Sequence, residues 1–520
     1  MTRQVPAPTF YLTTFGSSIA GTGGRMTPRQ VHVAVIGAGI AGMQFTRDLT
    51  RRGISHTVYE RGHEVGGTWR ENTYPGLFID VPVSLYQLSF ARKYDWSHAF
   101  PRGTEIQEYL VRASHEHDLR RHIRFGVEVL AATWVADHWE LELSDGTTEV
   151  ADAVVSATGF LDKPSMPAIP GMDGFAGLSF HSSNWPAGLD VAGKRIGVVG
   201  TGSSGIQLTT SLSSMGSQVT QFVRSPQWVE VITNPPAPRW LKAVGRLLGA
   251  RVPAVGRLVW KRLLGGPQLD PRLWRSIQWR IQPGPDRVAA QDALREDVLH
   301  IRDEDLRARM TPDFEPGCKR IPKSDRYFEA VQQPNVRVAV GAIDRVVPAG
   351  LVTADGELHE LDVIVYATGY DSHAYMRPMK VTGLRGRTID EAWADGPYAY
   401  RCVSVPDFPN FWVVNGPFAP VANISPTICV VDQSDYVCRL VEYGAEHGVA
   451  TAPTAEAAER FVAAIDEAMP NTIWAGDCDS WYRAGDRVVL WPWDEATYHA
   501  MFVPLGLDDL ELVPLPVAVP

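Results

Sequence analysis

Two stretches of the chain share one pattern of hydrophobic and polar positions. Residues 31–36 form an apolar, β-branched run that predicts a buried parallel strand, because such strands are covered on both faces. A glycine-rich turn and a helix-like stretch to about residue 52 follow, and a second strand at 57–60 ends in Glu60. This order of strand, helix and strand predicts a βαβ unit of a doubly wound sheet.

The turn after the first strand has the glycine spacing of a dinucleotide-binding unit. Gly37 permits a tight turn, Gly39 lets the backbone approach a pyrophosphate, and Gly42 lets the helix pack on the strand. Glu60, at the end of the second strand, lies where a carboxylate accepts a hydrogen bond from a ribose hydroxyl. The first half of the chain is therefore predicted to bind a dinucleotide.

The second half repeats the pattern, with strands predicted at 195–199 and 218–223. The turn and helix between them are predicted to contact a second nucleotide through Gly200, Thr201, Gly202, Ser203, Ser204, Gly205 and Gln207. Where the first half has Glu60, the second has Arg224 and Ser225. Because an arginine pairs well with a 2′-phosphate, we expect FAD in the first half and NADPH in the second. The alternative is a solvated arginine at a strand end.

The repeat predicts an α/β protein with two Rossmann-like dinucleotide-binding domains, one for FAD and one for NADP. Each half ends in an alternating, meander-like stretch followed by Ala-Thr-Gly, at 157–159 and again at 367–369. The predicted parts are a disordered tail at 1–29, an FAD domain at 30–165 and 370–520, a linker at 166–190, an NADP domain at 191–369 with a helical insertion at about 236–310, and an apolar, proline-rich tail from about residue 512.

Composition narrows the class of protein. A chain of 520 residues is long enough for two or three cores, and a net charge of −10 argues against a nucleic-acid-binding role. The odd number of cysteines, without a C-x-x-C pair, favours a reducing compartment and argues against a disulfide scaffold: Cys318, Cys402, Cys429, Cys438 and Cys478. The sequence has no long apolar run, so we expect a cytoplasmic protein with no membrane span. We expect it to be a monomer or a dimer.

Residues 239–282 are unusually basic, with ten lysines and arginines and a single acid, Asp270. One interpretation is a surface helix that makes weak peripheral contact with anionic lipid. The other is a helical subdomain whose basic face is solvated or attracts the anionic cofactor. The sequence leaves both interpretations open.

The segment between the two halves has the pattern F-x-G-x-x-x-H-x-x-x-W-P, carried by Phe175, Gly177, His181 and Trp185. By itself this pattern indicates a hinge with aromatic anchors. Together with the two glycine turns and the run G-G-T-W-x4-Y-P-G-x3-D that ends at Asp80, it resembles the type I Baeyer-Villiger monooxygenases, a family of class B flavoprotein monooxygenases.

The resemblance implies a reaction and its catalytic groups. Residues 314–320 look like the family segment that carries the active-site arginine, so Arg320 is expected beside the flavin, with Asp80 holding its guanidinium. A permanently charged arginine would stabilise a C4a-peroxyflavin anion and the oxyanion formed on a ketone. The implied reaction converts a ketone, NADPH and O2 to an ester or lactone, and no metal is required. His181 is expected to act as a hinge residue and not as a base.

The resemblance also implies cofactor contacts. Lys319 and Arg224 match positions that hold the 2′-phosphate, and Trp481 resembles a loop tryptophan over the nicotinamide and substrate. The expected contacts on the FAD side include Thr68, Trp69, Asp80, Tyr86 and Val129. Loops around 140–150, 325–335 and 420–440, and residues near Trp481, are expected to form the walls of the substrate pocket.

Two other functions compete with this interpretation. A flavin monooxygenase that oxidises nitrogen or sulfur has a similar linker pattern but lacks its terminal Trp-Pro. A non-catalytic flavoprotein that senses NADPH would explain the nucleotide turns. It would give no reason for Arg320, Asp80 and the linker to occur together.

Overall fold

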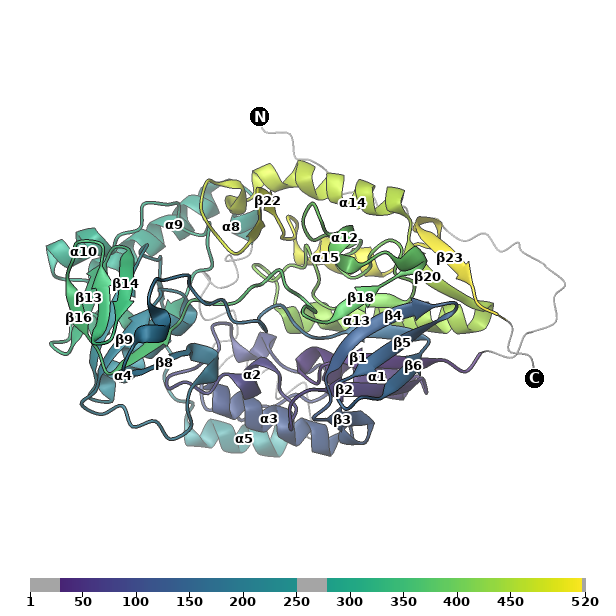
Figure 1. The fold of residues 1–520 in the computed structure, drawn as a ribbon, viewed down its shortest axis with the longest axis horizontal. Coiled ribbons are helices and arrows are strands. Elements are labelled where there is room, and N and C mark those ends of the chain that lie inside the picture. Colours follow the sequence, from purple (N-terminus) through teal and green to yellow (C-terminus); the bar gives the residue numbers. More distant parts are fainter. Residues whose placement is uncertain (1–28, 250–277, 517–520) are drawn as a thin grey trace.

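The computed structural model describes residues 29–249 and 278–516 (Figure 1). The predicted N-terminal tail therefore lies outside the described residues, except for Arg29, whose guanidinium pairs with Asp152 at 2.9 Å. Two five-stranded parallel sheets lie at opposite ends of the long axis of the molecule (Figure 1).

The first sheet is a parallel sheet built around the first predicted βαβ unit. Its strand order is β19 (Phe411–Val413), β7 (Ala153–Ser156), β1 (His32–Ile36), β2 (Ser55–Glu60) and β3 (Ile123–Phe125). The helix α1 (Ile40–Arg51) follows β1 and packs against α13 (Pro426–His447), which returns from the C-terminal part of the chain. Since β19 and α13 come from beyond residue 400, this half of the molecule is built from both ends of the sequence.

A four-stranded sheet packs beside the first one. Its order is β18 (Lys380–Thr382), β4 (Val129–Val135), β5 (His138–Leu143) and β6 (Thr148–Ala151). Trp139 on β5 is fully buried, and its ring lies 5.3 Å from that of Phe411 on β19. The four-stranded and five-stranded sheets therefore share one core.

The second parallel sheet repeats the first. Its order is β13 (Val336–Val340), β10 (Gln218–Val223), β9 (Arg195–Val199), β17 (Val363–Tyr366) and β8 (Leu178–His181), with α4 (Ser203–Ser214) after β9. A three-stranded antiparallel meander connects its last strands: β14 (Ile343–Val347), β15 (Gly350–Thr353) and β16 (Leu358–Glu360). The fold class predicted from the sequence is thus confirmed.

The predicted linker at 166–190 is more than a connector. Residues 178–181 form β8, an edge strand in which His181 pairs in register with Tyr366. A side chain at Gly177 would lie 2.5 Å from the carbonyl oxygen of Asp362, so the chain passes close to the sheet there. Because β8 is short and mostly exposed, its hydrophobic pattern gives no strand signal, and the neighbouring β17 determines its conformation.

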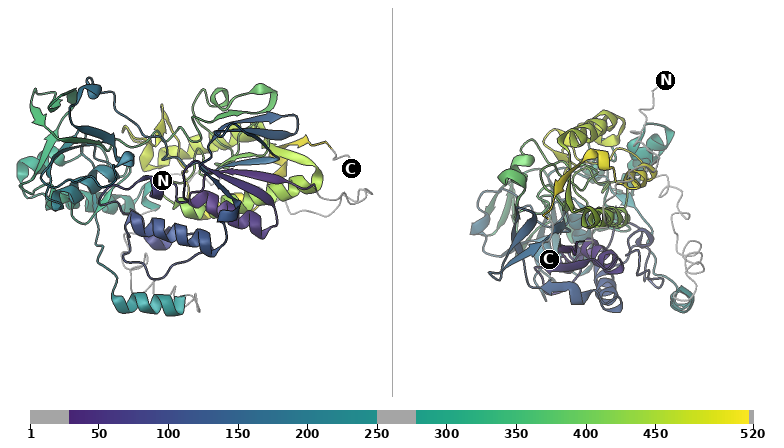
Figure 2. Two further views of the ribbon diagram at one scale, coloured as in Figure 1. Left: turned by 60° about the horizontal axis from the view of Figure 1, so that its bottom comes forward. Right: turned by 90° about the vertical axis from the view of Figure 1, so that its right-hand side faces the viewer.

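The described parts of the predicted insertion are helical: α5 (Arg239–Gly249), α8 (Gln278–Ile281), α9 (Pro285–Asp297) and α10 (Glu304–Met310). The helix α5 extends from the body of the molecule (Figure 2), and its Arg246 pairs with Asp95 at 2.6 Å. Most of the basic stretch lies at 250–277, outside the described residues. Across residues 29–249 and 278–516, no helix is long and apolar enough to cross a membrane.

The C-terminal part ends in a strand, not in the tail predicted from about residue 512. Strand β23 (Leu510–Pro514) pairs antiparallel with β20 (Val449–Pro453), which follows α13. Helices α14 (Ala455–Ala468) and α15 (Glu495–Phe502) lie between these strands in the sequence. Pairing with a distant strand gives the proline-rich segment its extended form, which local composition did not reveal.

Two cysteines form a disulfide, although their number and spacing had argued against one. Cys318 and Cys478 are bonded, with their Cα atoms 6.4 Å apart. Cys402, Cys429 and Cys438 are free and buried. The two bonded cysteines are 160 residues apart, so no local sequence motif predicts this disulfide.

Candidate active site

The first glycine-rich turn is shaped for close backbone packing. A Cβ at Gly37 would lie 2.8 Å from the carbonyl oxygen of Ala157, and one at Gly42 would lie 1.9 Å from that of Gly37. At Gly39, the N-cap of α1, a Cβ would meet only Gly67, at 3.7 Å. The N-terminus of α1 is therefore accessible, and it fits the pyrophosphate of a dinucleotide because unpaired backbone N–H groups point there.

Glu60 closes this turn from the end of β2. Its carboxylate is buried and accepts hydrogen bonds from the backbone N–H of Ala38 at 2.8 Å and of Gly62 at 2.7 Å. Arg70 Nη1 donates a third bond at 2.7 Å. Glu60, which the sequence predicts to bind a ribose hydroxyl, therefore fixes the loop beside this turn. We call the glycine-rich turn and the N-terminus of α1 the first nucleotide cradle, and the corresponding turn before α4 the second.

The second turn repeats the first. A Cβ at Gly200 would lie 2.4 Å from the carbonyl oxygen of Ala367, and one at Gly205 would lie 2.3 Å from that of Gly200. A Cβ at Gly202 would meet nothing within 4 Å. This open position at the N-terminus of α4 fits a second dinucleotide for the same reason as the first.

Two cations flank the second cradle. Arg224 follows β10, its side chain is 83% exposed, and it faces the carboxylate of Asp479 at 3.7 Å. Burial lowers the pKa of Lys319, with Asp479 opposing this effect and Arg224 adding to it. Two neighbouring cations that share one exposed carboxylate fit the 2′-phosphate of NADP(H). The hydroxyl of Thr201 donates to the carbonyl of Ser225 at 3.0 Å, which fixes the chain beside Arg224.

Side chains after the second turn bind the first half of the protein. The buried hydroxyl of Tyr74 donates to Gln207 Oε1 at 2.9 Å and lies 3.0 Å from Ser204 Oγ. Gln207 Nε2 donates to the carbonyl of Phe78 at 3.0 Å. The predicted cofactor residues Ser204 and Gln207 therefore hold the segment that leads to Asp80.

That segment brings Asp80 to Arg320 in a two-pronged ion pair. Arg320 Nη2 donates to Asp80 Oδ1 at 2.8 Å and Nε to Oδ2 at 3.2 Å, while Nη1 reaches the carbonyl of Val421 at 3.4 Å. Burial alone would lower the pKa of Arg320, but Asp80 and Tyr482 together outweigh this effect and raise it. The pair keeps a permanent positive charge in a fixed orientation and joins a residue of the first half to one of the second.

Two residues that the sequence analysis did not select lie beside this pair. Burial raises the pKa of Tyr482, whose hydroxyl interacts with the Arg320 guanidinium. Arg280 on α8 donates to the carbonyl of Ala422 at 3.4 Å, and within the described ranges no carboxylate lies at ion-pair distance from it. Burial lowers the pKa of Arg280, and Arg320 lowers it further. The site thus carries additional positive potential, which favours an anion.

Trp481 and Tyr482 line a small cavity of about 20 Å³ next to this cluster. The indole of Trp481 stacks on Phe160 with ring centres 6.1 Å apart, and the carbonyl of Trp481 accepts a hydrogen bond from Ser372 Oγ at 3.2 Å. Of the predicted pocket walls, 420–440 contributes Val421, whereas 140–150 and 325–335 contribute nothing to this cavity. Residues 140–150 lie in the β5–β6 region, and residues 325–335 lie around α11 (Tyr327–Ala330). Their positions in the sequence did not indicate that they lie away from Trp481.

The remaining predicted FAD contacts lie at α2 (Thr68–Glu71), next to it, and at the start of β4. Trp69 Nε1 donates to the hydroxyl of Tyr86 at 3.1 Å, and burial raises the pKa of Tyr86 to about 12. Thr68 is exposed at the start of the helix, and Val129 is buried at the start of β4. Trp69 and Tyr86 therefore form a pair, while Val129 belongs to the core beside the first sheet.

The linker motif is anchored at His181. Its ring is 2% exposed, Nε2 bonds with the carbonyl of Gly369 at 2.9 Å, and Nδ1 bonds with Ser183 Oγ at 2.8 Å. Burial lowers its pKa, so the ring is neutral near pH 7. Phe175 packs partly buried under the meander, and Trp185 packs edge-on against Phe180 at 5.3 Å. His181 therefore anchors the linker to the segment that follows β17.

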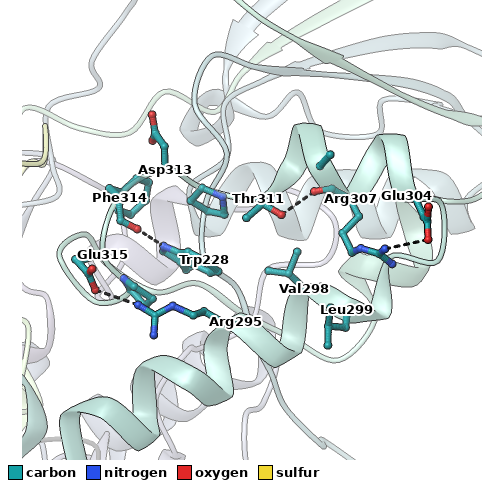
Figure 3. Close-up of a pocket in the computed structure, with 13 residues that line it drawn as sticks. Trp228, Arg295, Val298, Leu299, Glu304, Arg307, Thr311, Asp313, Phe314 and Glu315 are labelled. Atoms are coloured by element: carbon teal, nitrogen blue, oxygen red, sulfur yellow. Dashed lines mark hydrogen bonds and ion pairs between the residues drawn. The ribbon is translucent and has the colours of Figure 1, made fainter.

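A larger cavity lies elsewhere. It measures about 580 Å³ and lies under α9 and α10, around Trp228 (Figure 3). Its arginines are neutralised locally, since Arg295 lies 3.2 Å from Glu315 and Arg307 lies 3.6 Å from Glu304. Its lining contains no residue of the Arg320–Asp80 cluster, so size alone does not mark the reactive site. The described residues contain no group of three or more His, Cys, Asp or Glu that could hold a metal ion.

Fold and site together define a two-nucleotide flavoprotein. A family model described as flavin-binding monooxygenase-like matches residues 30–235. A Baeyer-Villiger monooxygenase of Streptomyces coelicolor is 37% identical over 478 residues, which cover 90% of this chain and 90% of that protein. An uncharacterised monooxygenase of Mycobacterium tuberculosis is 39% identical over 497 residues, which cover 94% of this chain and 97% of that protein.

Solved structures of similar fold support the same family as the sequence relatives do. A closed crystal structure of cyclohexanone monooxygenase has a TM-score of 0.81 at 29% identity and covers 94% of this chain and 100% of its own. The structure of OTEMO in complex with FAD and NADP has the same TM-score at 26% identity, with the same coverage. The chain therefore belongs to the type I Baeyer-Villiger monooxygenase family. It is an FAD-dependent monooxygenase whose cofactors are FAD and NADP(H).

Proposed function

We propose that the enzyme uses NADPH and O2 to convert a ketone to an ester or lactone through a C4a-peroxyflavin. The observation that supports this most directly is the Arg320–Asp80 ion pair, which joins the segment after the first glycine-rich turn to the second half of the chain. When bound, FAD accepts hydride from NADPH and supplies the electrons that activate oxygen. The side chains of this protein bind and orient the cofactors and stabilise the negative charge that forms during the reaction.

Arg320 has the central role in this proposal. Its guanidinium stabilises negative charge on the activated oxygen, and then on the oxyanion of the ketone adduct before a carbon migrates to oxygen. Asp80 keeps the guanidinium oriented and reduces the cost of burying its charge. Tyr482 and Arg280 contribute to the same positive environment.

The nicotinamide nucleotide is assigned to the second cradle. Gly200, Gly202 and Gly205 form the turn for its pyrophosphate, while Arg224 and Lys319 bind the 2′-phosphate. Trp481 would cover the nicotinamide and the substrate. FAD takes the first cradle, with residues 30–165 and 370–520 forming its domain and 191–369 forming the NADP domain.

Movement between the two halves is part of the proposal. The solved structures of cyclohexanone monooxygenase include forms described as closed, open and rotated. In this chain, His181 fastens the linker to Gly369, and the hydroxyl of Tyr370 donates to Asn72 Oδ1 at 2.8 Å. We infer that this linked set of side chains transmits domain movement to the cofactor.

Stopped-flow absorbance tests the proposed function. FAD-loaded enzyme is reduced with NADPH without oxygen and then mixed with oxygenated buffer, with and without a test ketone. A long-lived oxygenated flavin species is expected, which decays faster with ketone and is lost in Arg320→Ala. Arg295→Ala, which removes an arginine from the large cavity instead, is the matched control and should behave as wild type.

Direct reoxidation to flavin and hydrogen peroxide, equal in wild type and Arg320→Ala, would contradict the proposal. Faster decay with amines or thioethers but not with ketones would instead indicate a nitrogen- or sulfur-oxygenating enzyme.

A further inference from the structure

The Cys318–Cys478 disulfide joins two segments that meet at the ion pair of the site. Cys318 immediately precedes Lys319 and Arg320, and Cys478 lies just before Trp481 and Tyr482. The first segment leads into β12 (Lys323–Ser324), which pairs with β11 (Glu230–Val231) after the second sheet. The second segment follows α14, in the C-terminal part of the chain. The bond therefore crosses between the two halves of the molecule.

The other interactions of the Cys478 loop hold it mainly to the first half. Trp481 stacks on Phe160, and its carbonyl accepts from Ser372. Toward the second half, the Asp479–Arg224 pair is 3.7 Å long and joins side chains that are 90% and 83% exposed. An ion pair that exposed contributes little, because water and salt screen it. Besides the contact of Tyr482 with Arg320, the disulfide attaches the described loop covalently to the Lys319–Arg320 segment.

The position of the pair suits reversible chemistry. Cys318 is 2% exposed and Cys478 is 9% exposed, so the closed disulfide is shielded. Asp477 and Asp479 on either side of Cys478 are exposed, and a local opening of this loop would admit a small oxidant or reductant. The other three cysteines are buried and unpaired. The chain therefore offers one dithiol pair among its described residues.

We propose that Cys318 and Cys478 form a reversible redox site, which hydrogen peroxide oxidises and which fastens the Trp481 loop to the Lys319–Arg320 segment. The inference rests on the proposed NADPH- and O2-dependent function for its source of peroxide, because a reduced flavin that reacts with O2 without oxygenating a substrate releases hydrogen peroxide. A dithiol reductant returns the pair to two thiols by exchange.

The chemistry balances without a further reactant. One cysteine thiolate attacks a peroxide oxygen, a sulfur–oxygen bond forms, the oxygen–oxygen bond breaks, and the first water leaves. The second thiol then attacks that sulfur, the sulfur–sulfur bond forms, and the sulfur–oxygen bond breaks with release of a second water. Two thiols thus give two electrons to one peroxide, which yields one disulfide and two waters.

The bond would act through the loop. With Trp481 and Arg320 tethered, NADP+ leaves more slowly and water reaches the reduced cofactor less easily, because closed loops sequester a reaction from solvent. The peroxide that leaks from the site would thereby close it. In the dithiol form the loop moves more freely, and both NADP+ release and peroxide leakage increase.

Thiol counting tests the redox site without any ketone. FAD-loaded wild-type enzyme is reduced with dithiothreitol and desalted, and half is treated with a small excess of hydrogen peroxide. Both samples are then denatured in N-ethylmaleimide and digested. Five alkylated cysteines are expected in the reduced sample and three in the oxidised one, with Cys318 and Cys478 in one linked peptide. Because no turnover is needed, failure here is distinct from failure of the proposed function.

The same two samples test the effect on the loop. NADP+ release and ketone-free hydrogen peroxide production are each expected to be at least about threefold slower in the oxidised enzyme, a size consistent with gating by a loop. Dithiothreitol should restore both rates. Cys318→Ser and Cys478→Ser should not respond to peroxide, whereas Cys438→Ser, which alters an unpaired cysteine, should respond as wild type.

Four results would overturn the inference. Five thiols could remain after peroxide treatment, or a different pair of cysteines could be linked. Rates of NADP+ release could be equal in both forms although the disulfide has formed. Cys478→Ser could respond to peroxide as strongly as wild type does.

Discussion

At the scale of single residues, the protein places charge where its chemistry needs it. Arg320 is held by both oxygens of Asp80 and by the carbonyl of Val421, so its orientation is fixed before any substrate arrives. A charge that is already oriented loses no energy to reorganisation when an anion forms beside it. The residues on either side of the pair come from positions far apart in the sequence.

Asp80→Asn tests this arrangement. The amide keeps the shape of the carboxylate but leaves Arg320 without its counter-charge, so the guanidinium is free to reorient. We expect kcat to fall by about 10²-fold, in the range found when one oxyanion-stabilising group is lost, while the rate of flavin reduction by NADPH stays close to wild type. Asp95→Asn, which weakens the pairs with Arg246 and Lys93, is the control and should change neither rate.

His56 provides a pH-dependent prediction at the same scale. Burial lowers its pKa to about 4, and the neighbouring His122, His32 and Arg121 also disfavour its protonation. Because the folded pKa lies below the unfolded value of 6.5, the unfolded state binds the proton more readily as the pH falls. Stability from this group is thus complete above pH 6.5 and is lost between pH 6.5 and 4, by at most about 1.4 kcal/mol per pH unit.

Thermal unfolding of wild type and His56→Asn at pH 7.5, 6, 5 and 4.5 measures this effect. The wild-type melting temperature should fall more steeply with decreasing pH than that of the variant. Parallel pH profiles would show that His56 is not responsible.

At the scale of elements, the two glycine turns divide their tasks between packing and binding. In the second turn, Gly205 lets α4 approach β9, whereas Gly202 leaves open the space at the helix N-terminus. Both glycines lie on one turn. Replacing either one with alanine adds a single methyl group, so the effect on packing can be measured separately from the effect on nucleotide binding.

Gly202→Ala and Gly205→Ala form a matched pair. Gly202 has φ −71°, which alanine adopts freely, so this variant should keep its melting temperature and bind NADPH about tenfold more weakly, a loss of about 1.4 kcal/mol. In Gly205→Ala the Cβ would lie 2.3 Å from a carbonyl oxygen, and overpacking should destabilise the protein by about 1–3 kcal/mol. Fluorescence titration and thermal unfolding distinguish the two. Equal losses of NADPH affinity and of stability in both variants would contradict this division.

Strands without a continuous apolar run show where prediction from the sequence pattern fails. The apolar strands β1 and β9 and the helices that follow them were predicted nearly in full, because periodicity and glycine spacing are local. The strands β8 and β23 were predicted as a linker and a tail. Each is extended only because a distant strand supplies its hydrogen bonds, so composition gave no signal.

At the scale of the whole molecule, several connections cross between the halves. Among them, Tyr74 bonds with Gln207, Arg320 pairs with Asp80, and Cys318 is bonded to Cys478. The first two are non-covalent and exchangeable. The third is covalent and closes a loop of the chain across 160 residues.

Reduction of this disulfide is therefore expected to lower stability. A cross-link that closes a long loop restricts the unfolded chain, and native disulfides contribute about 2–4 kcal/mol. We expect the melting temperature of oxidised wild type to fall by several degrees with dithiothreitol. Cys478→Ser should show no such difference, and a reductant effect of equal size in that variant would assign the change to something other than the disulfide.

The sequence by itself determined the two βαβ units and the position of Arg224 at the end of a strand, because local spacing and residue type carry these features without their surroundings. Asp80, Arg320 and Lys319 became candidates through the resemblance of their segments to the family motifs. Only the tertiary structure decided that Tyr482 and Arg280 lie beside Arg320, that Gln207 bridges the halves, and that Cys318 meets Cys478. Contacts between residues far apart in the chain depend on how the sheets and loops pack, and no local pattern records that packing.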